Sequence, residues 1–239
     1  MSMKSNIISL VLVAVATLFC LPVFSQINDA TPQREVEYQQ DYKYKDFRFA
    51  VGGGYAYSVG AIEKTNDRII DDMNKKLRHG FTIDTDSQYF FKETWGLGLN
   101  ANMSSFSTSG SGFTLPDVEG TVHSYEEKQH IIYVGPTYAL RMETGKFFLL
   151  GTIGFGPIFF MDNLTINGIE VNGTKTTFGT NISLSGEYKM NNKMALGLKL
   201  SSTGGSIDSM NVEGEKIDSK EASSLYNIGV SIFLSFRSW

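Results

Sequence analysis

Hydrophobic and polar side chains alternate with a strict period of two near the C-terminal end of the chain. Between Leu225 and Arg237 the even-numbered positions are large and apolar, whereas the odd-numbered positions are mainly small or polar. In a β-strand this spacing puts the apolar side chains on one face. A strand of about 9–11 residues tilted by about 45° is long enough to cross a bilayer. The pattern therefore predicts a membrane-crossing strand.

Seven further segments show a similar alternation, so the sequence predicts eight strands in all. The other seven are expected at 47–58, 80–91, 95–105, 127–141, 146–161, 176–190 and 194–202. The face opposite the large apolar residues carries mostly Gly, Ala, Ser and Asn, which suit the crowded interior of an eight-stranded barrel. The apolar face then points outward to lipid. We therefore predict an all-β fold, an eight-stranded antiparallel up-and-down transmembrane β-barrel.

The connections between these strands alternate in length. Short turns are expected at 92–94, 142–145 and 191–193, and long segments at 59–79, 106–126, 162–175 and 203–224. Short periplasmic turns that alternate with long outer loops are typical of bacterial outer-membrane barrels. Aromatic residues of the expected strands also gather toward both ends, as in the girdles of such barrels. This layout predicts an outer-membrane protein with both termini in the periplasm.

The N-terminal segment has the features of a secretory signal. Lys4 gives it a short positive region, an apolar run from Ile7 to Phe19 follows, and the expected cut lies before Gln26. The run is shorter than the approximately 20 residues that a transmembrane helix needs. We therefore expect a cleaved signal peptide at 1–25, a polar periplasmic tail at 26–46 and the barrel at 47–239.

Composition narrows the functional classes. The net charge is −4 without a cluster of lysines and arginines, which argues against nucleic acid as a partner. The single cysteine, Cys20, falls within the expected signal peptide, so a mature chain would form no disulfide and no thiolate metal site. The mean hydropathy of −0.12 argues against a helical membrane protein but is compatible with a barrel that has a polar lumen. We predict no metal and no cofactor.

Short motifs carry a likeness to a known family. They are Gly-Gly-Gly-Tyr at 52–55, Tyr-Phe-Phe at 89–91, Trp-Gly-Leu-Gly at 95–98 and Asn-Ile-Gly-Val-Ser-Ile at 227–232. From 47 to 239 the chain resembles outer-membrane barrels of the OmpX and OmpA-transmembrane-domain type, as common in Bacteroidota. The resemblance implies that the barrel assembly machinery recognises the last strand during insertion. The residues of this expected insertion signal are Asn227, Gly229, Ile232, Leu234 and Phe236.

Charged residues are also expected inside the barrel. They are Arg48, Asp84, Asp86, Arg141, Glu187, Lys189, Lys199 and Arg237, and all except Lys189 form the expected lumen network. A proton relay or ion path is one interpretation, and a plug of paired charges is the other. An unpaired buried charge costs several kcal/mol, which favours the plug. We expect Asp84 and Asp86 to pair with Lys199. We expect Arg48 and Arg141 to reach Glu187.

Two features near the outer rim leave alternatives open. The three histidines, His79, His123 and His130, lie near this rim among many serines, as a lipid-modifying barrel enzyme would need, but no adjacent motif supports catalysis. The apolar positions of 67–77 follow one helical face, so this segment is expected to be a helix. Such a helix either binds a partner or the outer leaflet, or caps its own barrel.

Taken together, these patterns predict a monomeric, non-enzymatic outer-membrane protein with a structural or surface-interaction role. The expected partners are outer-membrane lipid, the assembly machinery and a surface partner that binds the segments 59–79, 162–175 and 203–224. Within 162–175, two alternating arms flank Asn167-Gly168 and indicate a hairpin. The alternatives are a narrow pore or small-ligand receptor and, less favoured, a lipid-modifying enzyme.

Overall fold

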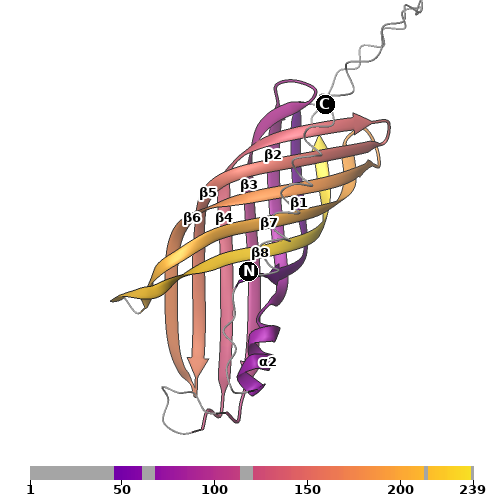
Figure 1. The fold of residues 1–239 in the computed structure, drawn as a ribbon. Coiled ribbons are helices and arrows are strands. Elements are labelled where there is room, and N and C mark those ends of the chain that lie inside the picture. The colour runs from indigo at the N-terminus through magenta and orange to yellow at the C-terminus, as the bar shows by residue number, and fades with distance from the viewer. Residues whose placement is uncertain (1–45, 61–67, 114–120, 213–214, 238–239) are drawn as a thin grey trace, which may run out of the picture. The chain divides into compact units, whose positions relative to one another are not determined.

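Eight antiparallel strands form a closed barrel in which each strand pairs with the next and β8 pairs with β1 (Figure 1). The computed structural model describes residues 46–60, 68–113, 121–212 and 215–237. The strands are β1 (Phe47–Ser58), β2 (His79–Phe90), β3 (Trp95–Gly110), β4 (Tyr125–Thr144), β5 (Phe147–Ile166), β6 (Ile169–Lys189), β7 (Met194–Val212) and β8 (Glu215–Arg237). This architecture confirms the predicted fold class. The expected signal peptide, and the expected polar tail except Asp46, lie outside the described residues.

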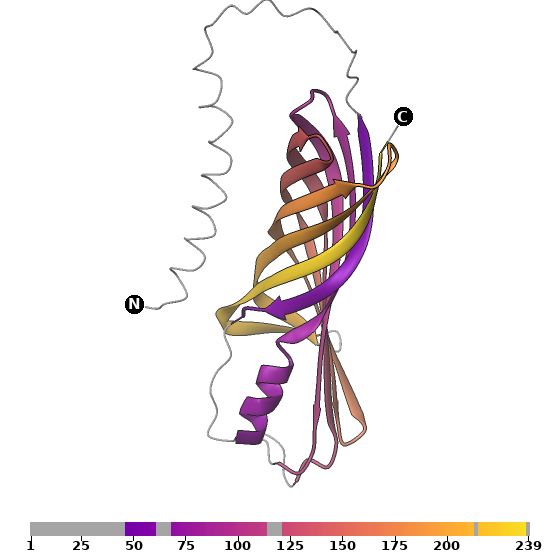
Figure 2. The same cartoon turned by 90° about the vertical axis from the view of Figure 1, so that its right-hand side faces the viewer.

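The two ends of the barrel are built differently. One end, here the turn end, holds the connections 91–94, 145–146 and 190–193, close to the predicted short turns. The opposite end, here the cap end, holds the helix α2 (Arg68–Lys76), which follows β1 in sequence. Figure 2 shows α2 beyond the point where β1 ends, beside strands that continue past it.

Six strands extend further toward the cap end than the sequence pattern indicated. β1 and β2 have 12 residues each, whereas β3 has 16 and β4 to β8 have 19 to 23. Within 162–175 the extension of β5 and β6 is the predicted hairpin around Asn167-Gly168. The segment 203–224, expected as a long loop, is mostly strand instead, and this expectation was wrong. The reason is physical: beyond the apolar wall neither face of a strand needs to be apolar, so the period of two is lost while the backbone pairing continues.

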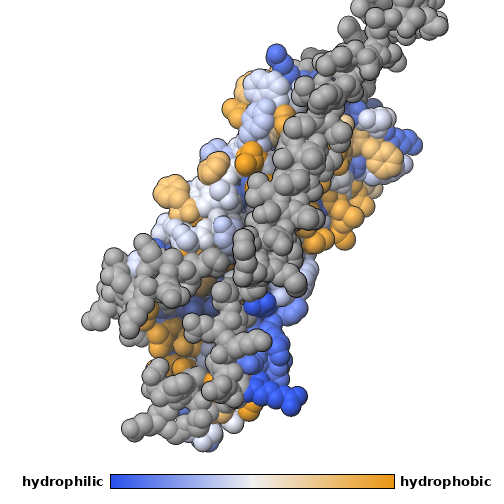
Figure 3. All heavy atoms as spheres, in the orientation of Figure 1, coloured by the Kyte–Doolittle hydropathy of each residue, from blue (hydrophilic) through white to orange (hydrophobic). Residues whose placement is uncertain are grey.

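Side-chain burial follows the predicted faces inside the wall. On β8 the odd-numbered residues from Leu225 to Arg237 are buried, and the even-numbered residues from Tyr226 to Phe236 are exposed. On β7 the leucines Leu196, Leu198 and Leu200 are exposed, whereas Lys199 is buried. Figure 3 shows apolar residues on the outer surface of the barrel. The assignment of the large apolar face to the outside is therefore confirmed.

The hairpin of β5 and β6 turns at Asn167-Gly168, as predicted. Ile166 pairs with Ile169 directly, which leaves a two-residue turn. Both turn residues have positive φ, 50° at Asn167 and 84° at Gly168. Asn and Gly tolerate this left-handed conformation, which matches the twist of the two strands. Among the described residues, no helix is both long and apolar enough to span a membrane.

Candidate functional site

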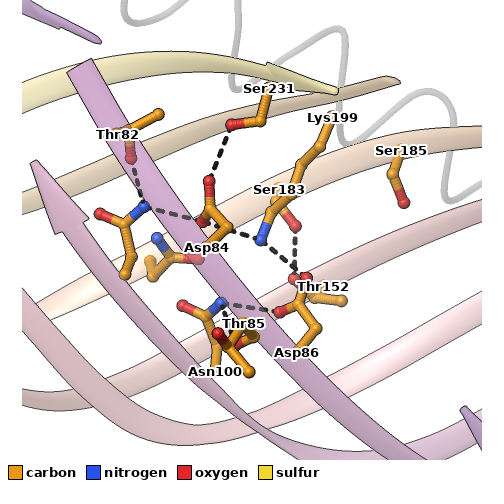
Figure 4. A network of polar contacts seen from close by, with 12 residues as sticks. Thr82, Asp84, Thr85, Asp86, Asn100, Thr152, Ser183, Ser185, Lys199 and Ser231 are labelled. Atoms are coloured by element: carbon orange, nitrogen blue, oxygen red, sulfur yellow. Dashed lines mark hydrogen bonds and ion pairs between the residues drawn. The ribbon is translucent and has the colours of Figure 1, made fainter. Parts of the chain in front are cut away.

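Lys199 on β7 lies at the centre of a buried polar group in the lumen (Figure 4). Its Nζ lies 2.8 Å from Oδ2 of Asp86 and 3.2 Å from Oδ1 of Asp84, both on β2. Asn100 Nδ2 donates to Asp86 Oδ1 at 2.7 Å, and Asn102 Nδ2 donates to Asp84 Oδ1 at 2.7 Å. The three expected charges are thus brought together. The carboxylate oxygens of the two aspartates also accept hydrogen bonds from uncharged amide groups, as a buried ion pair requires.

A second polar group surrounds Glu187 of β6, nearer the turn end. Arg48 of β1 donates through Nε to Glu187 Oε1 at 2.7 Å, and its Nη1 donates to Gln88 Oε1. The other carboxylate oxygen, Oε2, accepts from Ser235 Oγ and, at 3.0 Å, from Arg237 Nη2. Glu187 therefore joins strands β1, β6 and β8 across the lumen.

Arginines and aromatic rings fill the turn end of the lumen. The guanidinium of Arg141 lies 4.0 Å from the centroid of the Phe90 ring, and that of Arg237 lies 4.0 Å from that of Phe148. Arg141 Nε also donates to the carbonyl of Glu93 in the turn between β2 and β3. Cation–π contacts of this kind hold a charge against an apolar surface. The turn end is therefore packed with side chains.

Sequence reasoning missed the neutral and acidic partners of these charges. They are Gln88, Asn100, Asn102, Ser231 and Ser235, together with Glu143, which pairs with Lys189 at the turn end. All the neutral partners occupy positions that the period of two assigns to the lumen face of their strands. The sequence therefore indicates that they point into the lumen, but only the pairing register between strands shows which of them meet.

An apolar layer closes the lumen on the cap side of the Lys199 group. Its members come from several strands, and Leu77, just after α2, packs on it together with Met210. The buried members are Ala56, Phe106, Ile131, Tyr133, Ile158, Phe160, Ile207 and Leu225. Such a layer excludes water from the lumen, because close-packed apolar side chains leave few voids that a water molecule could occupy.

A separate apolar cluster, here the outer cap, lies beyond the apolar layer. Met73 of α2 is buried against Phe113 and Val122, and partly buried Ile70, Tyr125 and Ile166 pack around them. These residues come from α2, from the isolated bridge between 113 and 122, and from the ends of β4 and β5. Met73 and Ile70 of α2 therefore pack against the chain's own barrel, as the capping alternative expects. Ile69 of the same helix is exposed.

The hairpin tip is tied to the same assembly by hydrogen bonds. Asn167 Oδ1 accepts from the backbone N–H groups of His123 and Ser124 at 2.8 and 3.1 Å, and Asn167 N donates to Ser124 O at 2.8 Å. These hydrogen bonds fix the tip of the β5–β6 hairpin against the residues that precede β4.

An acidic pair lies between the apolar layer and the outer cap. Glu127 of β4 accepts from Tyr125 Oη at 2.6 Å and from Gln129 Nε2 at 2.7 Å. Asp162 of β5 lies past Phe159, the last strongly exposed aromatic residue of that strand. Burial, with the nearby charge of Glu127, raises the pKa of Asp162 to about 7. Burial, and then Glu127, also raise the pKa of Tyr125.

Comparison with known proteins identifies the class of this barrel. A family model described as "Outer membrane protein beta-barrel domain" matches residues 11–217. The chain belongs to this family. It is therefore an outer-membrane barrel protein. A search of the curated proteins found no match.

Several solved structures resemble this outer-membrane barrel. Neisserial surface protein A is 10% identical, with 80% of this chain and 97% of that chain covered and a TM-score of 0.47. The outer membrane protein OprG from Pseudomonas aeruginosa is 13% identical, with 82% and 97% covered and a TM-score of 0.48. A major outer membrane protein from Thermus thermophilus is 11% identical, with 80% and 99% covered and a TM-score of 0.49. At this level of similarity they carry nothing about function.

The expected insertion signal of the barrel lies on β8, between β7 and β1. Asn227 and Gly229 face the lumen, whereas Ile232, Leu234 and Phe236 are exposed on the outer wall. The histidines are dispersed: His79 begins β2 and hydrogen-bonds Tyr55, His123 precedes β4, and His130 lies within β4. Among the described residues, no three His, Cys, Asp or Glu side chains come together as metal ligands would.

Proposed function

We propose that this protein is a non-enzymatic outer-membrane barrel that displays its outer cap at the cell surface for a structural or surface-interaction role. The observation that carries the proposal is the extension of β3 to β8 past β1 and β2, with the ends of β4 and β5 packed against α2 in the outer cap. Strand ends that only needed to cross the bilayer would stop with β1 and β2, because about 9–11 tilted residues suffice. Extended, hydrogen-bonded ends present a rigid surface, which lowers the entropic cost of binding a partner.

The filled lumen supports this proposal over a pore. The Glu187 group, the Lys199 group and the apolar layer lie one after another between the turn end and the cap. An ion would need to break buried pairs or cross an apolar barrier, and both are costly. We expect the protein to form no stable channel in planar bilayers. Steady conductance of the purified barrel would reinstate the narrow-pore alternative.

The proposed orientation puts both termini and the turn end in the periplasm and the cap outside. Asn167 at the hairpin tip and Asn192 in a turn provide the test. A cysteine at Asn167 should react with an impermeant maleimide on whole cells, and a cysteine at Asn192 should react only after the outer membrane is broken. Reaction of the Asn192 position on intact cells would reverse the orientation.

A surface partner should contact the cap through its exposed lysines. Lys75 and Lys128 have exposed side chains, and both belong to cap-end elements. An impermeant amine cross-linker applied to intact cells should join these lysines to the partner. Lys75→Arg, Lys76→Arg and Lys128→Arg together remove the amines of these exposed cap-end lysines and keep the charge, so the adduct should disappear. An adduct that persists would place the contact elsewhere.

Insertion would use the assembly machinery, and we propose a monomer.

A further inference from the structure

The acidic pair between the apolar layer and the outer cap is bridged by a single amide group. Glu127 of β4 and Asp162 of β5 lie on the lumen faces of neighbouring strands, and Gln129 is the ladder partner of Asp162. Gln129 Nε2 donates to Glu127 Oε1 at 2.7 Å, and a side-chain hydrogen bond from Gln129 also reaches Asp162. The two carboxylates therefore converge on the same side chain.

The charge of this pair is not balanced by a basic side chain. Among the described residues, no lysine or arginine forms a salt bridge with Glu127 or Asp162, and the adjacent Lys128 pairs with Glu126 instead. Burial, and then the charge of Glu127, raise the pKa of Asp162 to about 7. Two carboxylates this close repel each other, so both are ionised together only when a proton donor or a cation relieves the repulsion.

Two oxygen atoms beside the acidic pair have no hydrogen-bond partner. Thr108 of β3 is the ladder partner of Glu127 and lies on the same lumen side. Thr108 is only 6% exposed, and its Oγ1 has no partner. Asp162 Oδ1 is also buried without a partner. Buried polar atoms in native proteins normally have a partner, and a bound ion can supply one. Unpartnered oxygens thus lie on both sides of β4.

We propose that Glu127, Asp162 and Thr108 bind a calcium ion. Calcium takes about 6–8 oxygen ligands in a flexible arrangement, including carboxylates, amide carbonyls and water. Rotation of the Gln129 amide by half a turn would present its carbonyl oxygen to the ion, and water would complete the shell. The sequence predicted no metal, and the described residues hold no group of three acidic or histidine ligands. Here neutral oxygens supplement two carboxylates.

The ion would reach this site from water at the cap end. Glu127, Gln129 and Asp162 are each partly exposed, in contrast to the fully buried Tyr133 of the apolar layer. A hydrated ion therefore crosses neither the apolar layer nor lipid. Once bound, it would join β3, β4 and β5 next to the outer cap. The site does not depend on the surface role proposed above.

Calcium titration of the full chain by isothermal calorimetry, in zwitterionic detergent micelles, tests the site. One calcium ion should bind per barrel. Glu127→Gln keeps the size of the side chain and removes its charge, so the affinity should fall by about tenfold or more. Thr108→Val keeps the shape and removes the hydroxyl, and it should also weaken binding. The matched control, Glu126→Gln, changes an exposed glutamate on the outer side of the same strand and should leave the affinity unchanged.

Proton release gives a second result, which a merely structural role would not produce. Calcium requires an ionised carboxylate, so binding at pH 7 should release about half a proton from Asp162 and binding at pH 9 should release none. Binding enthalpies in buffers with different ionisation enthalpies measure this number. If Glu127→Gln does not fold, Asp162→Asn replaces it, and this variant should release no proton.

Three results would overturn the proposal. They are the absence of saturable binding, equal affinities for Glu127→Gln and Glu126→Gln, and calcium binding at pH 7 without proton release. Each would leave the two carboxylates as a pair that shares a proton. An affinity that Thr108→Val leaves unchanged would contradict the proposed ligand set.

Discussion

At the scale of single residues, the lumen depends on charges that are stable only together. Glu187 accepts from two arginines on different strands, and Lys199 contacts two aspartates on one strand. Replacing such groups by apolar residues of the same shape can be neutral, whereas removing one partner leaves a charge buried without compensation. The polar groups therefore make the barrel sensitive to single substitutions that barely change its shape.

Glu187→Gln should destabilise the barrel by about 3–5 kcal/mol, because it deletes the charge that compensates Arg48 and Arg237 while it keeps the size of the side chain. Urea unfolding in lipid vesicles measures the effect. Glu126→Gln is the control, since Glu126 forms an exposed pair with Lys128 and exposed pairs contribute little. Equal unfolding midpoints for the two variants would show that the Glu187 group is not a stabilising plug.

Asp162 should make the stability of the cap end depend on pH. Its folded pKa of about 7 lies above the ordinary value of 3.8, so between these values the folded protein holds a proton that the unfolded chain releases. Stability should therefore fall as the pH rises from about 4 to about 7, and level off above.

The carboxyl carbon of Asp162 should titrate near pH 7 by NMR, and Asp162→Asn should remove the slope in urea midpoints. Asp72→Asn, at an exposed position on α2, should leave the slope intact. A titration midpoint near that of an ordinary aspartate would contradict the burial of this carboxyl.

At the scale of elements, the period of two predicted the parts of strands that lie in the wall. The bounds of β1 agree with the expected range, and β2 is shifted by one residue. The extension of β7 was not predicted because residues 203–212, Thr-Gly-Gly-Ser-Ile-Asp-Ser-Met-Asn-Val, have no apolar face that would indicate a strand. Helix α2 was expected from its amphipathic spacing, but its docking depends on Phe113 and Val122, which no local pattern connects to it.

Met73→Ala should loosen helix α2 from the outer cap. Met73 is buried and the substitution leaves a cavity, at a cost of about 2–5 kcal/mol. Trypsin should then cleave faster after Lys75 and Lys76, which follow Met73 on the same helix. Ile69→Ala is the control, because Ile69 is exposed on the same helix and its loss should not change the cleavage rate. Similar rates for both variants would mean that α2 is not held by its apolar face.

At the scale of the whole molecule, the barrel is an apolar wall around a filled lumen. The wall was predictable from sequence because the alternation within each strand indicates which of its faces is apolar. The contacts inside it were predictable only in part, because they depend on which residues of different strands lie at the same height. The pairing of Lys199 with Asp84 and Asp86 was expected, although β7 and β2 are not neighbours in the barrel. The pairing of Glu187 with Arg237 was not expected, and Arg141, which was expected at Glu187, lies over the Phe90 ring.

Leu198→Arg should destabilise the barrel by about 2–4 kcal/mol, because it puts a charge on the lipid face near the middle of the wall. Leu198 is 61% exposed and lies between Leu196 and Leu200 on that face. Folding into lipid vesicles in urea measures the effect. Asn163→Arg is the control, since Asn163 is exposed on β5 beyond the apolar wall. If both variants fold with equal stability, Leu198 does not face hydrocarbon.

The short reach of β1 also has a consequence for how the ring assembles. The ladder between β1 and β8 has 11 residue pairs, whereas that between β5 and β6 has 20 around a two-residue turn. The hairpin forms from neighbours along the chain, but the joint between β1 and β8 must bring the two ends of the domain together and loses the most chain entropy. Closure thus combines a high entropic barrier with one of the shortest ladders. It should be the slow step of folding, and the joint between β1 and β8 should open first when the barrel is unfolded by force.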